Sequence, residues 1–540
     1  MPNESVIILN KKKCNTHYKI GHDNVNIFGL DVHNPVFFIA IAFLLVVVAL
    51  TLVFPEQITL RLSDYSKWVT KELDWFFLGS ANIFVLSSLF LVFSPYGRVR
   101  IGGQSAKTEF SFASWIAMLF SAGIGVGIMF YAVLEPMNHF LTPPLGMTPS
   151  DSGSRELAMA ATLYHWAFHP WAIYATVGLS LAIFCYNKGL PMMIRSVFYP
   201  IWGEKTWGWR GHIVDLTAVF ATMFGLSATL GFGTSQTVGG LHHVFNTENN
   251  IKMNIAVILI ISVMAIFSLI RGLNGGIKRL SQLNMILAII LMIFVLIVGS
   301  TTDLIGEIFT NTAAYISYIP ELSNPVGRDD LGFMHGWTTF YWAWWISASP
   351  FVGMFIARIS IGRTVREFLI AVILCPSFIF ITWMTIFGST AIDQYINTGY
   401  TGVVETITQW KPEISFFAFI EQLPFSGLTA PLGIVLVIIF FVTTLDSASM
   451  IIDTMTSGGK HETPVKQKIF WCCLYTLVSI ALMLGGGLNA LQNAAIIIGV
   501  GFTFIILMMI INLYLGLKSE LIAIKEKEIA SNEINQAVPN

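Results

Sequence analysis

Tryptophan is concentrated in one short apolar string of the chain. Trp337, Trp342, Trp344 and Trp345 occupy four of nine consecutive positions in the string Gly336–Phe351. Aromatic faces attract cations, most strongly where water is excluded, and quaternary ammonium groups are typical ligands of such sites. Trp337 and Trp342 also suit an aromatic belt at a membrane surface. For Trp344 and Trp345 we favour a ligand box.

A second aromatic group occurs earlier in the chain. Trp166, Trp171 and Tyr174 fall on one broad face of a helix, because successive helical residues are rotated by about 100°. Pro170 should bend this helix and shift the face somewhat. The pattern predicts that three aromatic rings point in a similar direction.

Glycine takes alternate positions at Gly123, Gly125 and Gly127, just after Ser121. Small residues let helices pack closely, and three glycines in five positions also weaken a helix. Two interpretations stay open. One is a helix-packing face, and the other is a broken helix whose freed backbone groups line a binding site near mid-membrane, as in secondary transporters.

Hydroxyl groups are paired near the end of another apolar run. Thr443 and Thr444 follow Phe440, and Asp446 comes two residues later. Threonine hydroxyls usually bond back to their own helix, but with free carbonyls nearby they would also suit a small hard cation such as sodium. Asp446 is costly inside a span and is a functional candidate, although a water-exposed cap or a gate pair is an equal alternative.

The elements that position these residues must lie in a membrane. The chain has 540 residues, of which 55% are hydrophobic and 11% charged, against about 25% charged in an ordinary soluble domain. The net charge of −1 argues against a nucleic-acid partner. Five cysteines without framework spacing indicate buried packing residues and predict neither a disulfide scaffold nor a metal cluster.

Apolar runs of helical length predict twelve transmembrane spans and an all-α membrane protein. The spans are expected at 36–54, 76–95, 112–134, 157–186, 213–241, 253–270, 281–301, 337–357, 367–391, 429–453, 468–485 and 491–516. With these spans, 23 Lys and Arg residues fall on the side of the termini and seven on the other. The positive-inside rule then places both termini in the cytoplasm. We assign no signal peptide and no soluble domain.

The string Gly336–Trp345, together with Arg358–Arg366 just after it, resembles the signature of the betaine/carnitine/choline transporter (BCCT) family, in its sodium-coupled betaine-type branch. The resemblance extends from about Asn34 to Leu515, and Thr339 departs from the aliphatic residue that is usual at its position. It implies a leucine-transporter-like fold, with two inverted five-helix repeats at 112–301 and 337–516. Two additional helices at 35–111 precede them, a loop at 302–336 separates them, tails at 1–34 and 517–540 are cytoplasmic, and the assembly is a homotrimer.

The resemblance also implies roles for individual residues. The quaternary ammonium group would sit between Trp166, Trp171, Tyr174 and Trp345, beside Trp344 and the glycine-rich stretch. One sodium ion would be bound by the carbonyls of Ser121, Ile124 and Phe440 and by the hydroxyls of Thr443 and Thr444. A second sodium site would use Thr222 and Phe351. This site is less complete, because Leu226 stands where a hydroxyl is expected, although Ser227 is adjacent.

Two positions bear on the substrate. Choline-transporting members of the family often carry Asp where this chain has Gly127, so Gly127 favours a zwitterion. Ala348 replaces a tryptophan that is usual in sodium-coupled betaine transporters, which reshapes the site.

We therefore expect sodium-coupled uptake of a small zwitterion such as glycine betaine across a bacterial-type plasma (inner) membrane, with sodium as the coupling ion and no other cofactor. Proton-coupled or exchange transport of choline, carnitine, ectoine or a sulfonium osmolyte remains the alternative. The mixed charges of the C-terminal tail do not predict strong osmosensing.

Two other classes of protein compete with this expectation. A metal-dependent membrane enzyme could use histidines, since His165 and His169 stand four positions apart. No third ligand is evident, so packing or a hydrogen bond to a neighbouring helix is favoured for both. His212, His242 and His243 are scattered elsewhere. A channel is the third class, but an aromatic trap is better suited to a carrier.

Overall fold

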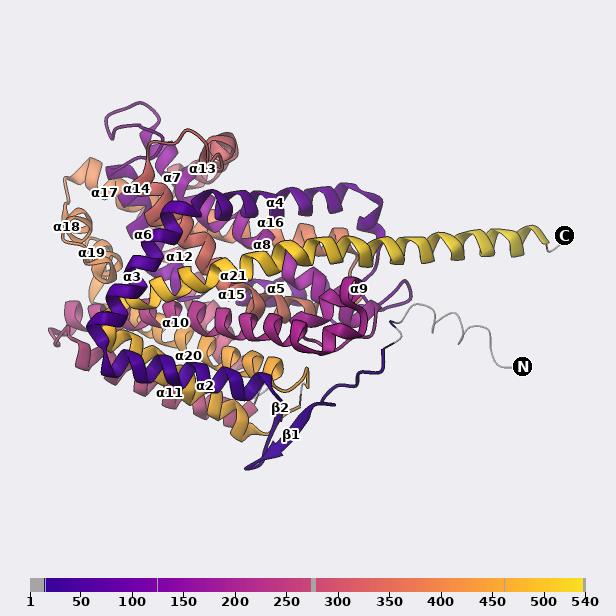
Figure 1. Ribbon diagram of the computed structural model, residues 1–540. Coiled ribbons are helices and arrows are strands. Elements are labelled where there is room, and N and C mark those ends of the chain that lie inside the picture. Colours follow the sequence, from indigo (N-terminus) through magenta and orange to yellow (C-terminus); the bar gives the residue numbers. More distant parts are fainter. Residues whose placement is uncertain (1–13, 15, 124, 273–277, 461, 538–540) are drawn as a thin grey trace.

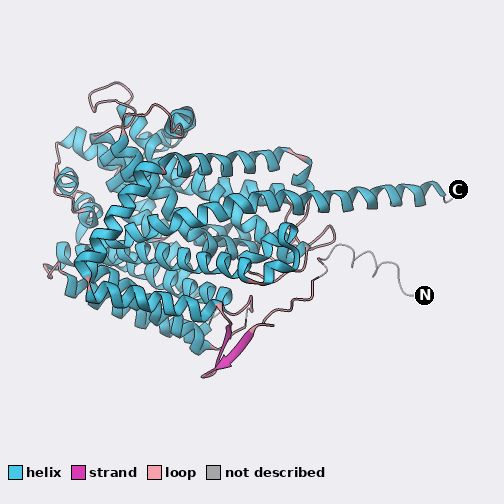
Figure 2. Cartoon of the chain, viewed as in Figure 1, coloured by secondary structure: helices cyan, strands magenta, loops and turns pink. Residues whose placement is uncertain are grey.

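A computed structural model describes residues 14, 16–123, 125–272, 278–460 and 462–537. The side chains of 120–123, 126, 272, 278 and 530–537 are not described. The described residues form a bundle of long helices, accompanied by one short β-hairpin (Figures 1 and 2). Ile124, which was expected to contribute a sodium ligand, lies outside the described residues.

The first half of the chain starts with the antiparallel hairpin, in which Asn24 pairs with His33, and continues in helices. In chain order the elements are β1 (Asn24–Ile27), β2 (Leu30–His33), α2 (Val36–Val53), α3 (Pro55–Glu72), α4 (Asp74–Phe93), η1 (Pro95–Arg98), α5 (Phe112–Gly123), α6 (Val126–Leu141), α7 (Ser154–Trp166), α8 (Phe168–Ala182), η2 (Ile183–Asn187), η3 (Ile194–Phe198), α9 (Tyr199–Trp202), η4 (Gly203–Trp207), α10 (Trp209–Phe245), α11 (Ile251–Gly272) and α12 (Lys278–Val298).

The second half is helical throughout its described elements. These are α13 (Thr301–Leu322), α14 (Leu331–Phe333), η6 (Met334–Thr338), α15 (Thr339–Ile359), α16 (Val365–Met384), η7 (Thr385–Ser389), α17 (Thr390–Thr398), α18 (Gly402–Thr408), η8 (Pro412–Ile414), α19 (Ser415–Glu421), α20 (Ser426–Thr456) and α21 (Val465–Ala537). The segment expected as a loop at 302–336 is mostly the helix α13, and the expected tail at 517–540 continues α21 as far as Ala537.

Nine helical segments within the described ranges are long and apolar enough to cross a membrane. They are Val36–Val53, Asp74–Phe93, Ser154–Asn187, Trp209–Phe245, Ile251–Arg271, Arg279–Val298, Val365–Thr398, Ser426–Thr456 and Val465–Ile529. The helical, apolar character of the predicted membrane protein is therefore confirmed. The number of twelve spans and the inverted repeats stay predictions.

The predicted spans that this count does not separate have structural explanations. The span expected at 112–134 is divided between α5 and α6, which have 12 and 16 residues. The span expected at 337–357 lies on α15, whose tryptophans and serines lower its mean hydropathy. The last two spans lie on α21, whose backbone is non-helical at Gly486 and Gly487, with φ +64° at Gly487.

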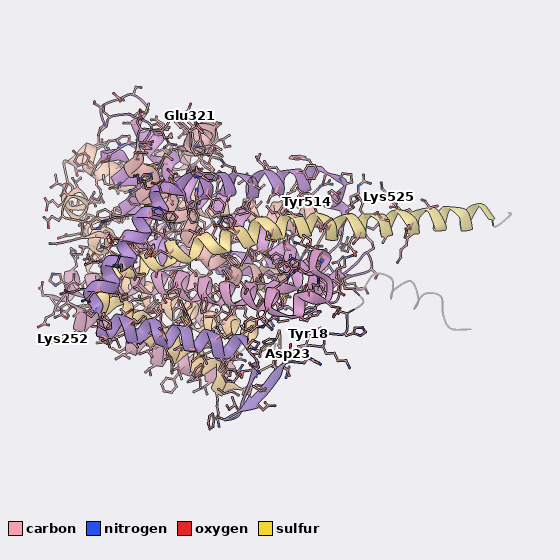
Figure 3. All side chains as sticks on the ribbon, in the orientation of Figure 1. Tyr18, Asp23, Lys252, Glu321, Tyr514 and Lys525 are labelled. Atoms are coloured by element: carbon pink, nitrogen blue, oxygen red, sulfur yellow. The ribbon has the colours of Figure 1, made fainter. Side chains whose placement is uncertain are left out.

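The two ends of the bundle differ in what they carry. The hairpin β1–β2 and the far end of α21 lie at one end, and α13, α17 and α18 lie at the other (Figure 1). With all side chains drawn, Tyr18 and Lys525 lie near the first end, whereas Lys252 and Glu321 lie toward the second (Figure 3). The two end segments of the described chain thus share one side of the bundle.

The hairpin is fixed to the connection between α20 and α21. The amide of Asp31 donates to Gln467 Oε1 at 2.8 Å, Asn24 Nδ2 donates to the carbonyl of Ser457 at 3.0 Å, and Lys460 pairs with the Asp31 carboxylate. Burial raises the pKa of Asp31, but the hydrogen bonds from Lys460 and Asn24 outweigh it and leave that pKa below its ordinary value.

The centre of the bundle depends on small residues where helices cross. A Cβ on Gly353 of α15 would lie 2.6 Å from Val177 Cγ1 and 3.1 Å from the amide nitrogen of Gly178, both on α8. No larger residue fits at this crossing without displacing α8. The close approach of α8 and α15 brings the two aromatic groups of the sequence together.

Candidate functional site

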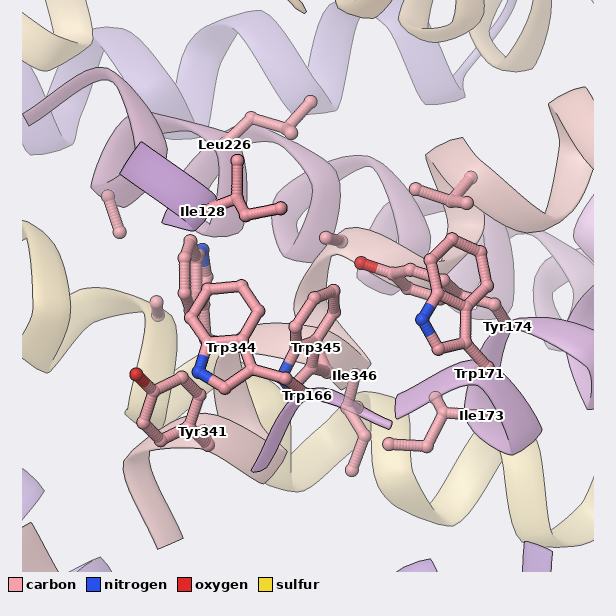
Figure 4. Close-up of a cluster of buried hydrophobic side chains, with 14 of the residues drawn as sticks. Ile128, Trp166, Trp171, Ile173, Tyr174, Leu226, Tyr341, Trp344, Trp345 and Ile346 are labelled. Carbon is pink, nitrogen blue, oxygen red and sulfur yellow. The ribbon is translucent and has the colours of Figure 1, made fainter. Parts of the chain in front are cut away.

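The two aromatic groups predicted from the sequence meet in the interior. Trp166 ends α7, Trp171 and Tyr174 lie on the first turns of α8, and Trp344 and Trp345 lie on α15 (Figure 4). All five side chains are buried. These five residues are called the aromatic box below.

The rings of the aromatic box contact one another edge to face. The Trp345 ring centroid lies 5.4 Å from the centroids of Trp166 and of Tyr174, and Trp171 lies 5.5 Å from Tyr174. Phe380 of α16, which the sequence did not single out, stacks on Trp166 at 5.3 Å. Because edges of some rings cover faces of others, a ligand that is to be held between these faces must part the rings. In this conformation the box is closed on itself.

A break between α7 and α8 gives the box its shape. Ala167 has non-helical dihedral angles, φ −99° and ψ −113°, and Pro170 explains the break because a proline ring clashes with the carbonyl four residues earlier, here that of Trp166. The freed carbonyl of His165 accepts a hydrogen bond from Trp345 Nε1 at 3.0 Å. The box is therefore tied to the broken backbone as well as to its rings.

The glycine-rich stretch is broken as well, in agreement with the second interpretation of its sequence. α5 ends at Gly123 and α6 begins at Val126, with Gly125 in an extended conformation between them. A Cβ on Gly127 would lie 2.8 Å from Trp344 Cη2 and 2.9 Å from Trp166 Cη2. Gly127 thus lies against the box, and any side chain there would compete with two tryptophan rings for space.

A buried carboxylate behind the box was missed at the sequence level. Glu135 of α6 is fully buried, and its Oε2 accepts a hydrogen bond from Trp166 Nε1 at 2.7 Å and another from the Tyr341 hydroxyl. Its Oε1 lies 2.7 Å from His165 Nδ1 and 3.3 Å from His139 Nε2. The predicted span ended at residue 134, which left Glu135 in a connection. An acidic residue directly after an apolar run was the available signal.

The two histidines suggested as a metal pair have different partners. His169 Nε2 lies 3.2 Å from Asn82 Oδ1 of α4, which is the favoured hydrogen bond to a neighbouring helix, and its ring stacks on Trp342. His165 instead joins Glu135 and His139 in a group whose ligand atoms lie within 4.8 Å of one another. Such a set can hold a metal ion. However, the Glu135 carboxylate already accepts hydrogen bonds from neighbouring side chains, and the second ring nitrogen of His165 also has a hydrogen-bond partner.

The residues expected to bind sodium are described only in part. Phe440, Thr443 and Thr444 lie together on α20, where the Phe440 carbonyl accepts hydrogen bonds from the hydroxyls of Thr443 at 2.9 Å and Thr444 at 2.8 Å. This is the back-bonded arrangement that was the ordinary alternative. The side chain of Ser121 is not described, and the whole of Ile124 lies outside the described residues.

At the second expected sodium site, Thr222 of α10 is buried and its hydroxyl has no hydrogen-bond partner in the described part of the chain. Phe351 is half-buried and Leu226 is buried. Ser227, the neighbouring hydroxyl, donates to the carbonyl of Met223 at 2.7 Å and receives a hydrogen bond from Ser479. It is therefore already occupied.

Two sequence expectations need correction. Asp446 is fully buried, so it is not a water-exposed cap in this conformation. Of the cysteines, only Cys472 is buried, Cys473 is exposed and the other three are half-buried, although all five are free. Helices of a membrane bundle place apolar residues outward as well as inward, which the sequence pattern did not distinguish.

A cage of aromatic rings beside two broken helices, inside a bundle of apolar helices, is typical of a multi-pass membrane protein, and the cage is its candidate ligand site. The chain belongs to the betaine/carnitine/choline family of transporters (BCCT), whose sequence profile matches residues 35–522. The resemblance seen in the sequence is confirmed at this level. The protein is a membrane transporter and not an enzyme.

Relatives with names that describe their substrates match over nearly full length. A glycine betaine/proline/choline transporter of Vibrio parahaemolyticus is 48% identical over 94% of this chain and 94% of its own. Glycine betaine transporter 1 of the same species is 45% identical over 94% and 97% of the two chains. The glycine betaine transporter OpuD of Bacillus subtilis is 38% identical over 91% and 96%.

Proposed function

We propose that this transporter takes up a small zwitterion with a quaternary ammonium group, such as glycine betaine, in symport with sodium. The observation that carries the proposal is the aromatic box, in which the ring centroid of Trp345 lies 5.4 Å from those of both Trp166 and Tyr174 in a buried site. Dry aromatic faces bind quaternary ammonium groups at about 2 kcal/mol or more per contact.

The zwitterionic character of the substrate follows from position 127. An acidic side chain at Gly127 would serve as a counter-charge for a full cation, but a Cβ there already meets Trp344 and Trp166 at less than 3.0 Å. A substrate that brings its own carboxylate needs no such residue. The three relatives described above all carry glycine betaine in their names, and two of them are named for glycine betaine alone, whereas the first is also named for proline and choline.

Transport would follow alternating access around the box. The closed rings would part to admit the ammonium group, and the extended backbone at Gly125 would offer amide groups to the carboxylate. Sodium would then join α5 to α20, with Phe440, Thr443 and Thr444 as its ligands on α20. Binding would be coupled to closure because only the loaded site holds both helices together.

The remaining features of the proposal concern the whole chain. Two inverted five-helix repeats, a homotrimer, an inner-membrane location and cytoplasmic termini are what the family resemblance and the basic residues favour. A second sodium ion at Thr222 is supported by a buried hydroxyl that has no partner among the described residues. Carnitine, ectoine or a sulfonium osmolyte remains a possible substrate in place of glycine betaine, because Ala348 alters the box.

The proposal is tested by uptake of labelled glycine betaine, choline, carnitine, ectoine and proline in cells that lack their own transporters, with an inward gradient of sodium or of potassium. We expect saturable accumulation of glycine betaine only with sodium. Trp345→Leu should raise KM for it at least about 30-fold, the equivalent of about 2 kcal/mol for one lost aromatic face.

Trp345→Phe is the matched variant, because it keeps an aromatic face and should retain uptake with a KM nearer that of the parent protein. The amount of each variant in the membrane is measured in parallel. Undiminished uptake by Trp345→Leu would remove the box from the mechanism, and equal accumulation with potassium would remove sodium coupling.

A further inference from the structure

We propose that Glu135 is a positioning residue for the aromatic box and also its buried counter-charge, acting on the bound cation through Trp166. This inference rests on the proposed function, because it assumes that the box holds an ammonium group. It concerns a residue that accepts a hydrogen bond from the N–H edge of Trp166.

The contacts of Glu135 join two of the three helices that carry the aromatic box, α7 and α15, to α6. Its carboxylate lies on α6, directly after the broken glycine-rich stretch, and is bound by Trp166 Nε1 at 2.7 Å and by the Tyr341 hydroxyl. His165 and His139 lie at 2.7 Å and 3.3 Å from its other oxygen. A single side chain thus links α6 with α7 and α15.

The positioning role follows from the geometry of Trp166. Three of the contacts of its indole are the hydrogen bond from Nε1 to Glu135, the stacking of Phe380 at 5.3 Å, and an edge-to-face contact with Trp345 at 5.4 Å. Of these three, the hydrogen bond is directional and sets the rotation of the ring. Without it, the face that Trp166 offers to a ligand would be set by weaker ring contacts alone.

The counter-charge role follows from burial. Glu135, His139 and His165 are 0%, 1% and 0% exposed, and a charge in such surroundings is poorly screened. Two neutral donors and two imidazole nitrogens around one carboxylate suit its ionised, acceptor-only form. A negative group at the N–H edge of an indole increases the attraction of the indole face for a cation.

The charge should matter differently for two kinds of substrate. Choline carries a positive charge and no carboxylate, so its binding depends on negative groups of the protein. Glycine betaine brings its own carboxylate and gains less from a second one. Glu135 would therefore let the box accept a cation even though Gly127 leaves no room for an acidic side chain beside the ligand.

The experiment compares Glu135→Gln, which keeps the shape and removes the charge, with Glu135→Asp, which keeps the charge and is one methylene too short to reach Trp166. KM for glycine betaine and the inhibition constant of choline against its uptake are measured for each. For Glu135→Gln we expect choline inhibition to weaken about tenfold and the KM for betaine to rise about threefold. For Glu135→Asp the inhibition constant of choline and the KM for betaine should rise by similar factors.

The change in the ratio of the two constants is the decisive readout, because a merely structural defect would weaken both substrates alike. Glu307→Gln is the control, since Glu307 pairs with Arg155 away from the box and its loss should leave the ratio unchanged. Trp166→Phe removes the N–H that binds Glu135 and keeps a smaller aromatic ring, and it serves the same purpose if Glu135→Gln does not accumulate in the membrane. Its ratio should shift in the same direction, and the double variant should shift no further.

Three results would overturn the inference. An unchanged ratio in Glu135→Gln and in Trp166→Phe would leave Glu135 as a structural residue only. Additive shifts in the double variant would show that Glu135 does not act through Trp166. One equivalent of a transition metal in the purified protein would assign Glu135, His139 and His165 to a metal centre instead. If the parent protein accumulates no ammonium substrate, the proposed function itself fails, which is a different outcome from a failed ratio.

Discussion

Trp345 shows how one side chain can serve both the structure and the ligand. Its indole nitrogen donates to the carbonyl of His165 at 3.0 Å, while its ring contacts Trp166 and Tyr174. The hydrogen bond satisfies a backbone group that the break at Ala167 leaves without a helical partner. The same bond holds the ring where an ammonium group would meet it.

Gly127 tests whether the spacing of the box rings matters for transport. Gly127→Ala adds a methyl group that would lie 2.8 Å from Trp344 and 2.9 Å from Trp166, so both rings must shift. Overpacking of this kind costs about 1–3 kcal/mol, and we expect KM for glycine betaine to rise about tenfold with the amount of protein unchanged. Uptake kinetics of the variant check this.

Gly306→Ala provides the control at the residue scale. Gly306 lies on α13, and a Cβ there meets no described atom within 4 Å. The KM of this variant should stay within about twofold of the parent value. Equal defects in both variants would point to a general effect of replacing glycine, and not to crowding of the rings.

The residues of the box could be singled out from the sequence because aromatic side chains at helical spacing form a local pattern. Glu135 was not, because its partners come from distant parts of the chain: Tyr341 is 206 positions away and Trp166 is 31 positions away. Nor could the sequence show that His165 binds this carboxylate while His169 binds Asn82. Such choices depend on which helix faces meet.

At the scale of the elements, interrupted helices recur, and two of the interruptions are close to the aromatic box. The break at Gly125 and the break at Ala167 both adjoin the box, and each contains or is close to glycine or proline in the sequence. A third interruption, at Gly486 and Gly487, divides α21. The sequence offered the first break as one of two interpretations, predicted only a bend at Pro170, and placed a boundary between spans at 485–491.

The interruption of α21 requires glycine at position 487. Its dihedral angles, φ +64° and ψ −150°, are accessible to glycine and strained for any other residue. Gly487→Ala should therefore cost about 1–3 kcal/mol and lower the midpoint of thermal unfolding. Chromatography of detergent-solubilised protein after heating measures that midpoint.

Gly501→Ala, later in the same helix, is the matched control. A Cβ at Gly501 would meet Thr217 Cγ2 at 3.5 Å, an ordinary contact, and alanine favours a helix over glycine by about 1 kcal/mol. We expect this variant to keep or raise the unfolding midpoint. If both substitutions lower it equally, the cause is crowding of α21 and not backbone strain.

Across the whole molecule, sodium coupling would depend on helices that are far apart in the chain. α5 and α20 lie in the two halves of the sequence. The proposed ion would join them, with Phe440, Thr443 and Thr444 as its ligands on α20. Thr444→Ala removes one oxygen, so we expect the sodium concentration for half-maximal uptake to rise about tenfold, the equivalent of about 1.4 kcal/mol. Uptake at a series of sodium concentrations measures this.

Thr454→Ala separates loss of a ligand from loss of a helix contact. Thr454 is buried on the same helix and its hydroxyl donates to the carbonyl of Met450 at 3.0 Å, as Thr444 does to Phe440. Its removal should leave the sodium dependence unchanged. A similar change in both variants would assign the effect to α20 as a whole and leave the ion without this ligand.

The sequence by itself determined that this protein lies in a membrane, because 11% charged residues cannot cover water-facing domains. It also singled out aromatic residues that could hold a cation, and a glycine-rich stretch and a proline where helices could break or bend, since ring chemistry, glycine and proline act locally. Only the tertiary structure decided that Gly127 touches Trp344, that Glu135 binds Trp166 and that Asp446 is buried. These facts depend on how helix faces meet, and packing between segments distant in the chain leaves no local pattern to read.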